Sequence, residues 1–313
     1  MLRIGIIGAG QFSKQHVEQL QELPQVEISG IFDKEAGRAT EVGTQFGIPA
    51  RSNFDDLLAH SDAVHVVCST HAHFEMASQA LRLGKHVFIE KPMTATPEQA
   101  GELIKMSLEA DVKCMVGYNE RFNPAFQAME GRLNRLVFAE SHRVTPFTPR
   151  TGNISVVLDL MIQDIDLILK LVKSDIRQIS ATGVRVLGDT PDIANVRLEF
   201  NNGCVANLTA SRLADREKRS LRLFEQDAYY RLNLLHPEVH RITLAQRSSL
   251  HQAHAIQSEK IHIEKHNTLQ AQFQCFIDCI LNNKPCPTSP QEAYSAMDVA
   301  FRIMKKIETQ GNP

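Results

Sequence analysis

The chain has 313 residues, a formal net charge of −2 and 43% hydrophobic residues, and this composition excludes a disordered or strongly basic protein. A chain of this length usually needs more than one hydrophobic core, so we expect two domains. The charge is nearly balanced, no apolar run approaches the ~18 residues of a spanning helix, and the first predicted strand leaves no room for a targeting peptide, so we expect a cytoplasmic protein with neither nucleic acid nor membrane as a partner.

The first 120 residues alternate predicted strands and helices. The strands are short, almost uninterrupted apolar runs, which is typical of a parallel sheet covered on both faces. Strand–helix repetition of this kind predicts a doubly wound α/β domain over 1–120. The expected strands are Arg3–Ile7, Val26–Phe32, Ala63–Cys68, His86–Ile89 and Lys113–Gly117. The expected helices are Gln11–Leu20, Lys34–Phe46, Phe54–Leu58, Phe74–Leu83 and Pro97–Ala110.

Beyond residue 120 several segments alternate apolar and polar residues. Val196–Phe200 is an example, and the turn Asn201–Gly203 that follows it is a strong hairpin signal. The pattern predicts a mostly antiparallel sheet with one covered face, in a second domain over 121–313. The expected strands are Val137–Val144, Ile176–Val186, Ala194–Phe200, Cys204–Ser211, Ser220–Glu225 and Tyr229–Leu234. The expected helices are Val156–Leu171, Leu269–Leu281 and Gln291–Ile307, while residues 236–266 have no clear assignment.

A glycine-rich turn directly follows the first predicted strand. The segment from Gly8 to Ser13 is a variant of the dinucleotide-binding pattern GxGxxG, with serine in the third place. Gly8 allows the tight turn, and Gly10 lets the backbone approach a pyrophosphate at the helix N-terminus. Asp33 ends the second predicted strand, where a carboxylate is expected to bind the ribose. Together these features predict a dinucleotide site, and a turn that serves packing alone is the alternative.

Asp33 also bears on the choice between NAD and NADP. A carboxylate accepts hydrogen bonds from ribose hydroxyls but repels the 2′-phosphate of NADP. We therefore expect NAD as the cofactor. Lys34 and Arg38 are close in sequence and would soften that repulsion, so the use of NADP stays open.

A lysine follows the fourth predicted strand. The carboxyl ends of parallel strands are where such sheets bind ligands, and Lys91 lies just past that end, after Glu90. An amine in a cleft of low dielectric exchanges protons near neutrality, so Lys91 is a candidate base for the hydroxyl proton of an alcohol substrate. The alternative is an exposed loop lysine paired with Glu90.

At this point the chain resembles a known family. The GxG turn, Asp33 and the segment Gly84–Pro92, with the sequence GKHVFIEKP, are similar to the glucose-fructose oxidoreductase, inositol dehydrogenase and rhizopine-catabolism (Gfo/Idh/MocA) family. The similarity runs over essentially the whole chain and includes Gly117–Pro124, which resembles the family's GYNxRFxP segment. The resemblance implies an N-terminal Rossmann domain and a C-terminal α/β domain with a large open, mostly antiparallel sheet. That sheet commonly mediates dimers or tetramers, so we expect a homodimer or homotetramer.

An apolar predicted helix carries a polar stripe. Asp159, Gln163 and Asp166 lie at positions i, i+4 and i+7 of Val156–Leu171 and so share one face, which must meet water, a partner or a ligand. The family's motif DxGxHxxD matches this stripe, so the resemblance puts Asp159 in the place of the catalytic aspartate and Gln163 in the place of the catalytic histidine. An amide does not relay a proton at neutral pH, so Lys91 would carry the acid–base step alone.

The resemblance assigns further residues to the site. Cys68–Thr70 and His73 match a segment that lines the cofactor, and Asn119 and Arg121 match a segment near the active cleft. The residues expected at the cofactor are Gly8, Gly10, Gln11, Phe12, Asp33, Arg38, Ser69, Thr70, His73, Glu90, Lys91 and Asn119. The residues expected at the substrate are Lys91, Arg121, Asp159 and Gln163, of which Lys91, Asp159 and Gln163 are the catalytic candidates.

The cysteines and histidines do not predict a metal site. None of the six cysteines forms a CxxC pair, and Cys275 and Cys279, one helical turn apart, are better interpreted as buried thiols. His236 and His240 are four residues apart, but Pro237 interrupts any helix between them. We therefore expect no metal.

Two functions remain open from the sequence. The first is an NAD-dependent dehydrogenase that oxidises a secondary alcohol of a sugar, a cyclitol or a nucleotide sugar. Leu160–Ile162 and Glu120–Pro124 look most like the family branch that oxidises UDP-N-acetylglucosamine at C3, although that branch has histidine in place of Gln163. The second is a dinucleotide-binding sensor without turnover, which Gln163 favours and the intact Glu90, Lys91 and Asp159 disfavour.

Overall fold

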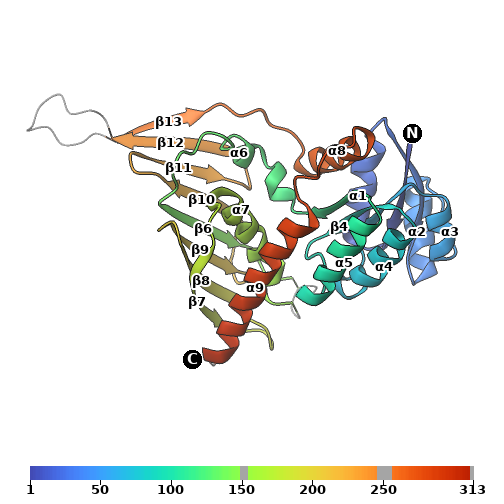
Figure 1. Ribbon diagram of the computed structural model, residues 1–313, viewed down its shortest axis with the longest axis horizontal. Helices are drawn as coiled ribbons and strands as arrows, with labels where there is room; N and C mark the ends of the chain where they lie inside the picture. Colours follow the sequence, from blue (N-terminus) through green and yellow to red (C-terminus); the bar gives the residue numbers. More distant parts are fainter. Residues whose placement is uncertain (149–153, 245–255, 311–313) are drawn as a thin grey trace, which may run out of the picture. The chain divides into compact units, whose positions relative to one another are not determined.

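The computed structural model describes residues 1–148, 154–244 and 256–310 (Figure 1). The chain forms two compact units, of which the first is Met1–Asn119 with Asn267–Ser295 and the second is Glu120–His266 with Ala296–Pro313. The first segment of the first unit ends at Asn119, and we had expected the domain boundary at residue 120. Residues 267–295, which we placed in the second domain from their order along the chain, instead return to the first unit.

The first unit is built on a parallel sheet, as predicted. In the part of the chain that the structure describes, this sheet has five strands in the order β2-β1-β3-β4-β5. The strands are β1 (Leu2–Ile7), β2 (Val26–Phe32), β3 (Ala63–Val66), β4 (His86–Glu90) and β5 (Cys114–Gly117). The helices are α1 (Gln11–Gln21), α2 (Ala36–Phe46), α3 (Phe54–Ala59), α4 (Thr70–Arg82), α5 (Pro97–Glu109) and α8 (Thr268–Leu281), and α4 and α5 lie side by side (Figure 1).

The strand order creates a topological switch point in this unit. From β1 the chain adds β2 on one side, and it then adds β3, β4 and β5 on the other side, so the strand order switches between β1 and β3. Ligands of such sheets bind outside the carboxyl ends of the strands at that point. β1 ends at Ile7 and is followed by the glycine turn, while β3 ends at Val66 and is followed by Cys68–Thr70. The topology therefore brings together two segments that the sequence places 60 residues apart.

An aromatic cluster fixes α8 to the first unit. Phe273 and Phe276 of α8 pack against Phe88 of β4, with ring centroids 5.3 and 5.7 Å apart. His65 of β3 stacks on Phe88 at 4.6 Å, and His16 of α1 lies 4.8 Å from Phe273. These contacts explain why a segment late in the sequence belongs to this unit, which the sequence pattern did not reveal.

His65 makes the first unit sensitive to acid. Its ring is fully buried and neither ring nitrogen has a hydrogen-bond partner among the described residues. Burial and the nearby His16 therefore hold the pKa of His65 well below its usual value. The unfolded chain takes up a proton near pH 6.5 but the folded chain does not, so the stability that His65 contributes is complete above about pH 6.5 and is lost as the pH falls.

We expect the free energy of unfolding of the first unit to fall with decreasing pH below about 6.5, by up to about 1.4 kcal/mol per pH unit from His65 alone. His65→Leu should remove this part of the slope, because leucine binds no proton in either state. Urea unfolding at pH 5 and pH 7 measures the difference, with the exposed His60→Leu as the control. An unchanged slope in His65→Leu would contradict the assignment.

The second unit contains the predicted mostly antiparallel sheet. Within the described ranges it has eight strands in the order β13-β12-β11-β10-β6-β9-β8-β7, and β6 and β9 are its parallel pair. The strands are β6 (Phe138–Val144), β7 (Ile176–Val184), β8 (Ile193–Phe200), β9 (Val205–Ser211), β10 (Lys218–Phe224), β11 (Ala228–Asn233), β12 (Glu238–Leu244) and β13 (Ile256–Ile261). β12 and β13 fall in the polar segment that we left unassigned, and they lie at one edge of the sheet, where polar side chains are typical.

One face of this sheet is apolar and covered. Val196, Leu208 and Leu221 are fully buried in one row across β8, β9 and β10, with Ser141 of β6 between the last two. Arg197 and Arg222, one position along the chain, are exposed on the opposite face. The predicted helix over Val156–Leu171 covers the apolar face and consists of a π-helical turn, Val157–Met161, followed by α7 (Ile162–Val172). The remaining helical segments are a 3₁₀ turn (Asn119–Phe122), α6 (Pro124–Gln127) and α9 (Pro290–Gln310), which begins in the first unit and ends in the second.

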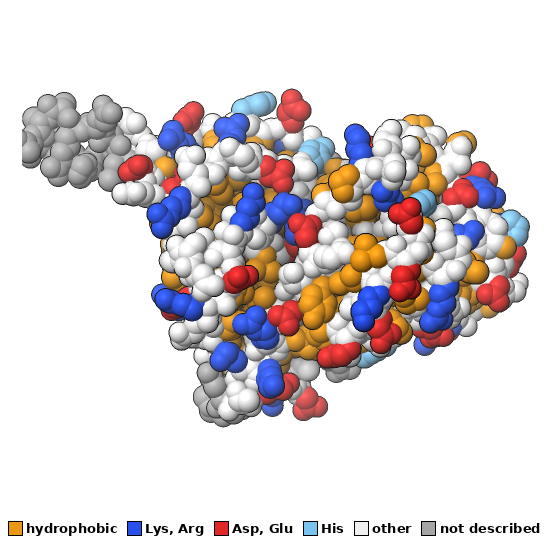
Figure 2. Space-filling model, viewed as in Figure 1, with side chains coloured by type: hydrophobic (Ala, Val, Ile, Leu, Met, Phe, Trp, Pro, Cys, Tyr) orange, Lys and Arg blue, Asp and Glu red, His pale blue; other side chains and the backbone are white. Residues whose placement is uncertain are grey.

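The surface carries charges of both signs. Lys and Arg side chains are intermixed with Asp and Glu over the visible face (Figure 2). None of the described helices is both long and apolar enough to cross a membrane.

Candidate active site

The turn after β1 requires glycine. Gly8 has φ +108°, and a Cβ there would lie 2.8 Å from both Cα and N of Cys68. The turn is therefore in direct backbone contact with the segment that follows β3. Hydrogen bonds from Gly8 N to Phe32 O (2.8 Å) and from Val67 N to Ile7 O (2.9 Å) continue the sheet up to this contact.

The N-terminus of α1 is open at Gly10. No side chain caps this helix, and a Cβ built on Gly10 would meet nothing within 4 Å. The N–H groups of the first turn and the positive end of the helix dipole suit a pyrophosphate, which approaches most closely where no Cβ intervenes. Ser13 is fully buried and its hydroxyl donates to Gly10 O at 2.6 Å, so serine fits the third position of the motif. Gln11 and Phe12 are the first two residues of α1, next to Gly10, and both are exposed, Phe12 to 49%.

Asp33 braces the same turn. Its carboxylate accepts from Ala9 N at 2.8 Å and from Glu35 N at 2.9 Å, which holds it at the end of β2. A carboxylate has about four acceptor sites, so it retains capacity for ribose hydroxyls. Arg38, which we expected near the cofactor, is exposed and pairs with Glu35 at 2.9 Å. This ion pair engages the guanidinium that would otherwise favour a 2′-phosphate.

A buried histidine ties two segments of the candidate site together. His73 is 1% exposed, and its Nδ1 and Nε2 lie 3.0 Å from Pro92 O and 3.1 Å from Cys68 O. Burial lowers the pKa of His73 although these carbonyls act in the opposite direction. His73 therefore links the segment after β3 to the segment after β4. Ser69 and Thr70 of that first segment begin α4, whose N-terminus has no side-chain cap either.

Lys91 directly follows β4. The last residue of β4 is Glu90, which lies opposite Gly117 of β5. The Glu90 carboxylate accepts from Lys91 N at 3.1 Å and lies 3.3 Å from His16 Nε2. Burial raises the pKa of Glu90, but the hydrogen bond from His16 and the charge of Lys91 outweigh it, so the pKa is below its usual value and the carboxylate is ionised. Lys91 itself is half-buried at the same edge of the sheet as the glycine turn.

Asn119 follows β5 at this edge and begins the 3₁₀ turn Asn119–Phe122. The sequence-predicted cofactor residues of the first unit therefore follow the carboxyl ends of all five described strands of one sheet. Their direct contact with a cofactor stays a prediction.

The second unit holds the other candidates, and Arg121 is strongly engaged there. Arg121 Nε and Nη2 donate to the two carboxylate oxygens of Asp166 at 2.7 and 2.6 Å, and both side chains are buried. This two-point ion pair joins the 3₁₀ turn to α7. Arg121 is thus part of the framework of the unit, and a substrate contact by it stays a prediction.

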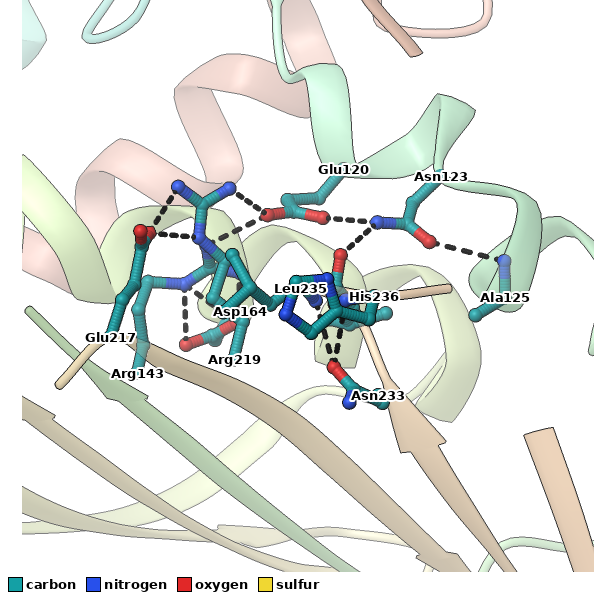
Figure 3. Close-up of polar contacts among 11 residues, drawn as sticks. Glu120, Asn123, Ala125, Arg143, Asp164, Glu217, Arg219, Asn233, Leu235 and His236 are labelled. Atoms are coloured by element: carbon teal, nitrogen blue, oxygen red, sulfur yellow. Dashed lines mark hydrogen bonds and ion pairs between the residues drawn. The ribbon is translucent and has the colours of Figure 1, made fainter. Parts of the chain in front are cut away.

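A second buried ion network lies beside this pair, and the sequence analysis did not foresee it. Arg143 of β6 donates to Asp164 of α7 at 2.8 Å and to Glu120 at 2.8 Å (Figure 3). Arg219 of β10 reaches the same Glu120 at 3.2 Å. Burial raises the pKa of Glu120, but Arg143 and Arg219 outweigh it and the pKa is below its usual value. The signal available in the sequence was Asp164, a third carboxylate within an otherwise apolar helix.

The same network orients the turn that carries the resemblance to GYNxRFxP. Asn123 donates to Glu120 at 3.0 Å and to Leu234 O at 2.8 Å, and it accepts from Ala125 N at 3.1 Å (Figure 3). The first residues of the second unit are therefore held by β6, β10, α7 and the end of β11 together.

Asp159 and Gln163 lie on the predicted helix, but its first turn is π-helical. A π turn takes more residues than an α turn, so the offset between Asp159 and the face of α7 differs from the regular i, i+4 relation we assumed. Asp159 is half-buried and Gln163 is 6% exposed. Single π turns inside helices occur frequently at functional sites.

Metal ligands do not gather in the structure. No group of three or more His, Cys, Asp or Glu side chains within 1–148, 154–244 and 256–310 is arranged to hold a metal ion. Burial raises the pKa of the Cys275 thiol to about 12, and Cys279 contributes to the shift. Such thiols are poor nucleophiles at neutral pH.

Comparison with known proteins gives two family matches. A model described as an oxidoreductase family with an NAD-binding Rossmann fold matches residues 2–118, and a GFO/IDH/MocA C-terminal domain model matches residues 129–230.

Individual relatives extend the match over the whole chain. UDP-N-acetylglucosamine 3-dehydrogenase of Acidithiobacillus ferrooxidans is 34% identical over 98% of this chain and 97% of its own length. A solved structure of that enzyme has a TM-score of 0.93 at 31% identity and covers 98% of both chains. Myo-inositol 2-dehydrogenase of Thermotoga maritima is 27% identical over 68% of this chain and 69% of its own length. A structure from gentamicin A biosynthesis in complex with NAD shares the fold, with a TM-score of 0.84 at 20% identity, and covers 99% of this chain and 95% of its own.

Proposed function

Because this chain belongs to the Gfo/Idh/MocA family of oxidoreductases with an NAD-binding Rossmann fold, we propose that it oxidises a secondary alcohol of a nucleotide sugar and that UDP-N-acetylglucosamine is its first candidate substrate. The observation that carries this proposal is Lys91 beside the half-buried, ionised Glu90, in a chain similar over 98% of its length to a UDP-N-acetylglucosamine 3-dehydrogenase. Free sugars and cyclitols are the next candidates, as in the inositol dehydrogenase relative.

The first unit would hold NAD at the carboxyl end of its sheet. The backbone from Gly8 to Gly10 and the uncapped end of α1 would bind the pyrophosphate, and Asp33 would accept from the adenosine ribose. Bound there, the nicotinamide ring supplies the hydride acceptor. Gly8, Gly10 and Ser13 match the demands of this group, because each is small where the structure has close backbone contacts or open space.

Lys91 would move the proton. Oxidation of an alcohol to a ketone removes a hydride from the carbinol carbon and a proton from its hydroxyl, and the neutral amine of Lys91 would accept that proton. In the reverse direction the ammonium would return it to the carbonyl oxygen. Glu90 keeps a negative charge next to the lysine and fixes its backbone N–H.

Asp159 and Gln163 would hold the substrate by hydrogen bonds and would not exchange the proton of its reacting hydroxyl. The Gln163 amide donates and accepts hydrogen bonds but neither gains nor loses a proton at neutral pH. We propose that it orients the reacting hydroxyl or carbonyl and that Asp159 orients the sugar.

The uncovered polar face of the second unit's sheet carries Arg197 and Arg222. We expect a second copy of the chain to associate with this face.

NADH formation by the purified protein tests the proposed function. NAD is supplied with UDP-N-acetylglucosamine, other UDP-sugars, free hexoses and inositols, and we expect absorbance of NADH to rise with UDP-N-acetylglucosamine or a close analogue. Bound NAD without turnover on any member of the panel would contradict the dehydrogenase and favour a second function, a dinucleotide-binding sensor.

Gln163 is the observation that favours the second function. If the chain is a sensor that lost its proton relay, Gln163→His should create turnover that the wild type lacks. If the chain is an enzyme with Lys91 as its acid–base group, the wild type turns over and Gln163→His changes the rate without creating it. Steady-state kinetics of both proteins separates the two functions.

Asp33 should set the preference for NAD. We expect Asp33→Asn to reduce the ratio of kcat/KM for NAD to that for NADP by about 10-fold or more, because removing one charge from beside a 2′-phosphate is worth about 1.4 kcal/mol or more. The single side-chain oxygen of asparagine can still accept from Ala9 N, which keeps the bond to the glycine turn, while the bond from Glu35 N is lost. Glu109→Gln, which removes an exposed carboxylate at the end of α5, is the control. An unchanged ratio in Asp33→Asn would contradict the role of Asp33.

A further inference from the structure

The Glu90 carboxylate is enclosed on three sides. Lys91 N donates to Oε2 at 3.1 Å, and His16 Nε2 lies 3.3 Å from Oε1. On the third side a Cβ added to Gly117 would lie 2.7 Å from Oε1 and 2.9 Å from Cδ. These neighbours restrict where the carboxylate lies, and two of them are distant in sequence, namely a histidine in another helix and a glycine in the neighbouring strand.

The ring nitrogen of His16 that donates to Glu90 can be assigned from its surroundings. The residue is 2% exposed, and its Nδ1 is buried with no hydrogen-bond partner among the residues that the structure describes. A proton on Nδ1 would stay buried without an acceptor, which is costly, whereas Nε2 lies 3.3 Å from a Glu90 oxygen, so Nε2 is the nitrogen that donates to Glu90. Phe273 of α8 packs against the ring at 4.8 Å and closes its other side.

His16 also lies on the helix whose N-terminus faces the cofactor turn. It is six residues after Gly10, on the buried side of α1. The contact from His16 to Glu90 thus runs from the helix that would bind the pyrophosphate to the residue next to Lys91.

We propose that His16 is a positioning residue, which acts through Glu90 to hold Lys91 in register with the cofactor helix. The proposal rests on the proposed function, because it takes Lys91 as the acid–base group. His16 touches neither the substrate nor the reacting atoms. Its loss would leave the glycine turn and Asp33 intact and would release the Glu90 carboxylate and the lysine that follows it.

His65 provides a matched control. It lies in the same aromatic cluster, 6.1 Å from His16 between ring centroids, and it is equally buried. Its nitrogens have no hydrogen-bond partner among the described residues, so it packs beside His16 without acting on Glu90. A purely structural role for His16 predicts equal effects at both positions, whereas the positioning role predicts an effect at His16 alone.

Kinetics of four proteins tests the proposal, namely wild type, His16→Leu, His16→Gln and His65→Leu, with the substrate found in the panel. His16→Leu should lower kcat by about 10- to 100-fold, as a misplacement of about 1 Å does, while the Kd for NAD changes less than about threefold. His16→Gln, which keeps a donor near the position of Nε2, should recover most of that loss, and His65→Leu should retain the kcat of wild type. Equal losses in His16→Leu and His65→Leu, or no loss in His16→Leu, would overturn the proposal.

A second readout needs no substrate. The rate at which Lys91 is acetylated by acetic anhydride, followed by mass spectrometry of its peptide, reports the environment of its amine directly. It should change in His16→Leu and return toward the wild-type rate in His16→Gln, and an unchanged rate in His16→Leu would overturn the positioning role even if no substrate is found. A silent substrate panel together with a changed rate would instead contradict the proposed function alone.

A substitution in the neighbouring strand β5 affects the same carboxylate from a side other than that of His16. Gly117→Ala should displace the Glu90 carboxylate, because the added Cβ would overlap it, and should reproduce the loss of kcat seen in His16→Leu. This variant keeps the proposal testable if His16→Leu does not fold. A Gly117→Ala protein that is folded and has the kcat of wild type would contradict it.

Discussion

Lys91→Ala is expected to lower kcat by about 10³-fold or more, because it removes the group that exchanges a proton with the substrate hydroxyl. Lys91→Arg should be similarly impaired, since a guanidinium keeps the positive charge but does not release its proton near neutral pH. The affinity for NAD should stay near the wild-type value in both variants. Lys105→Ala, an exposed lysine on α5, is the control.

The comparison of the two variants separates charge from proton transfer. If Lys91 served only as a positive charge that binds substrate, Lys91→Arg would keep most of the activity and Lys91→Ala would mainly raise KM. Full activity in Lys91→Arg would therefore contradict the acid–base role. Steady-state kcat and KM, with the Kd for NAD from fluorescence titration, measure these outcomes.

Arg143→Met is expected to destabilise the second unit by about 3–5 kcal/mol, because it leaves buried carboxylates without their cation. Arg143 lies between Asp164 and Glu120, and both carboxylates are almost completely buried. Burial alone would lower the pKa of Arg143, but these carboxylates raise it above its ordinary value. The arginine therefore stays charged, and it compensates the negative charges of the two buried carboxylates.

Arg219→Met is the matched control for this prediction. Arg219 binds the same Glu120 at 3.2 Å but is 35% exposed, so water replaces much of what it contributes. We expect a loss of less than about 1 kcal/mol, the usual size for an exposed pair. Thermal unfolding of the three proteins measures the difference, and equal losses in Arg143→Met and Arg219→Met would contradict the role of burial.

The parallel sheet and its glycine turn were predictable because they leave local signals. β2 begins and ends where we expected, at Val26 and Phe32, since an apolar run between turn residues defines a buried strand. Gly8 was identified from the motif, and its φ of +108° and the contact with Cys68 give the physical reason for glycine at that position. The hairpin at Asn201–Gly203 likewise follows from turn chemistry, with Gly203 at φ +86°.

The contacts between segments distant in sequence were not predictable from one chain. The return of α8 to the first unit depends on Phe273 and Phe276, and any amphipathic helix would show the same pattern. The pairing of Arg121 with Asp166 was missed for a related reason. An arginine in a motif that resembles an active-site segment and an aspartate on a polar stripe each suggest a ligand, and only the structure pairs them with each other.

The π-helical turn was also outside the reach of periodicity. We placed Asp159 and Gln163 on one face from the spacing of a regular α-helix, and Val157–Met161 departs from that spacing. A hydrophobic pattern reports an average period, so a single wide turn at the start of a strongly apolar helix leaves no clear signal.

Transfer of deuterium tests the central claim most directly. UDP-N-acetylglucosamine that carries deuterium at C3 is incubated with NAD and the purified chain, and the NADH formed is examined by mass spectrometry. The account predicts that the NADH carries the deuterium and that Lys91→Ala forms almost none. A wild-type protein that binds NAD and UDP-N-acetylglucosamine but transfers no deuterium would contradict it.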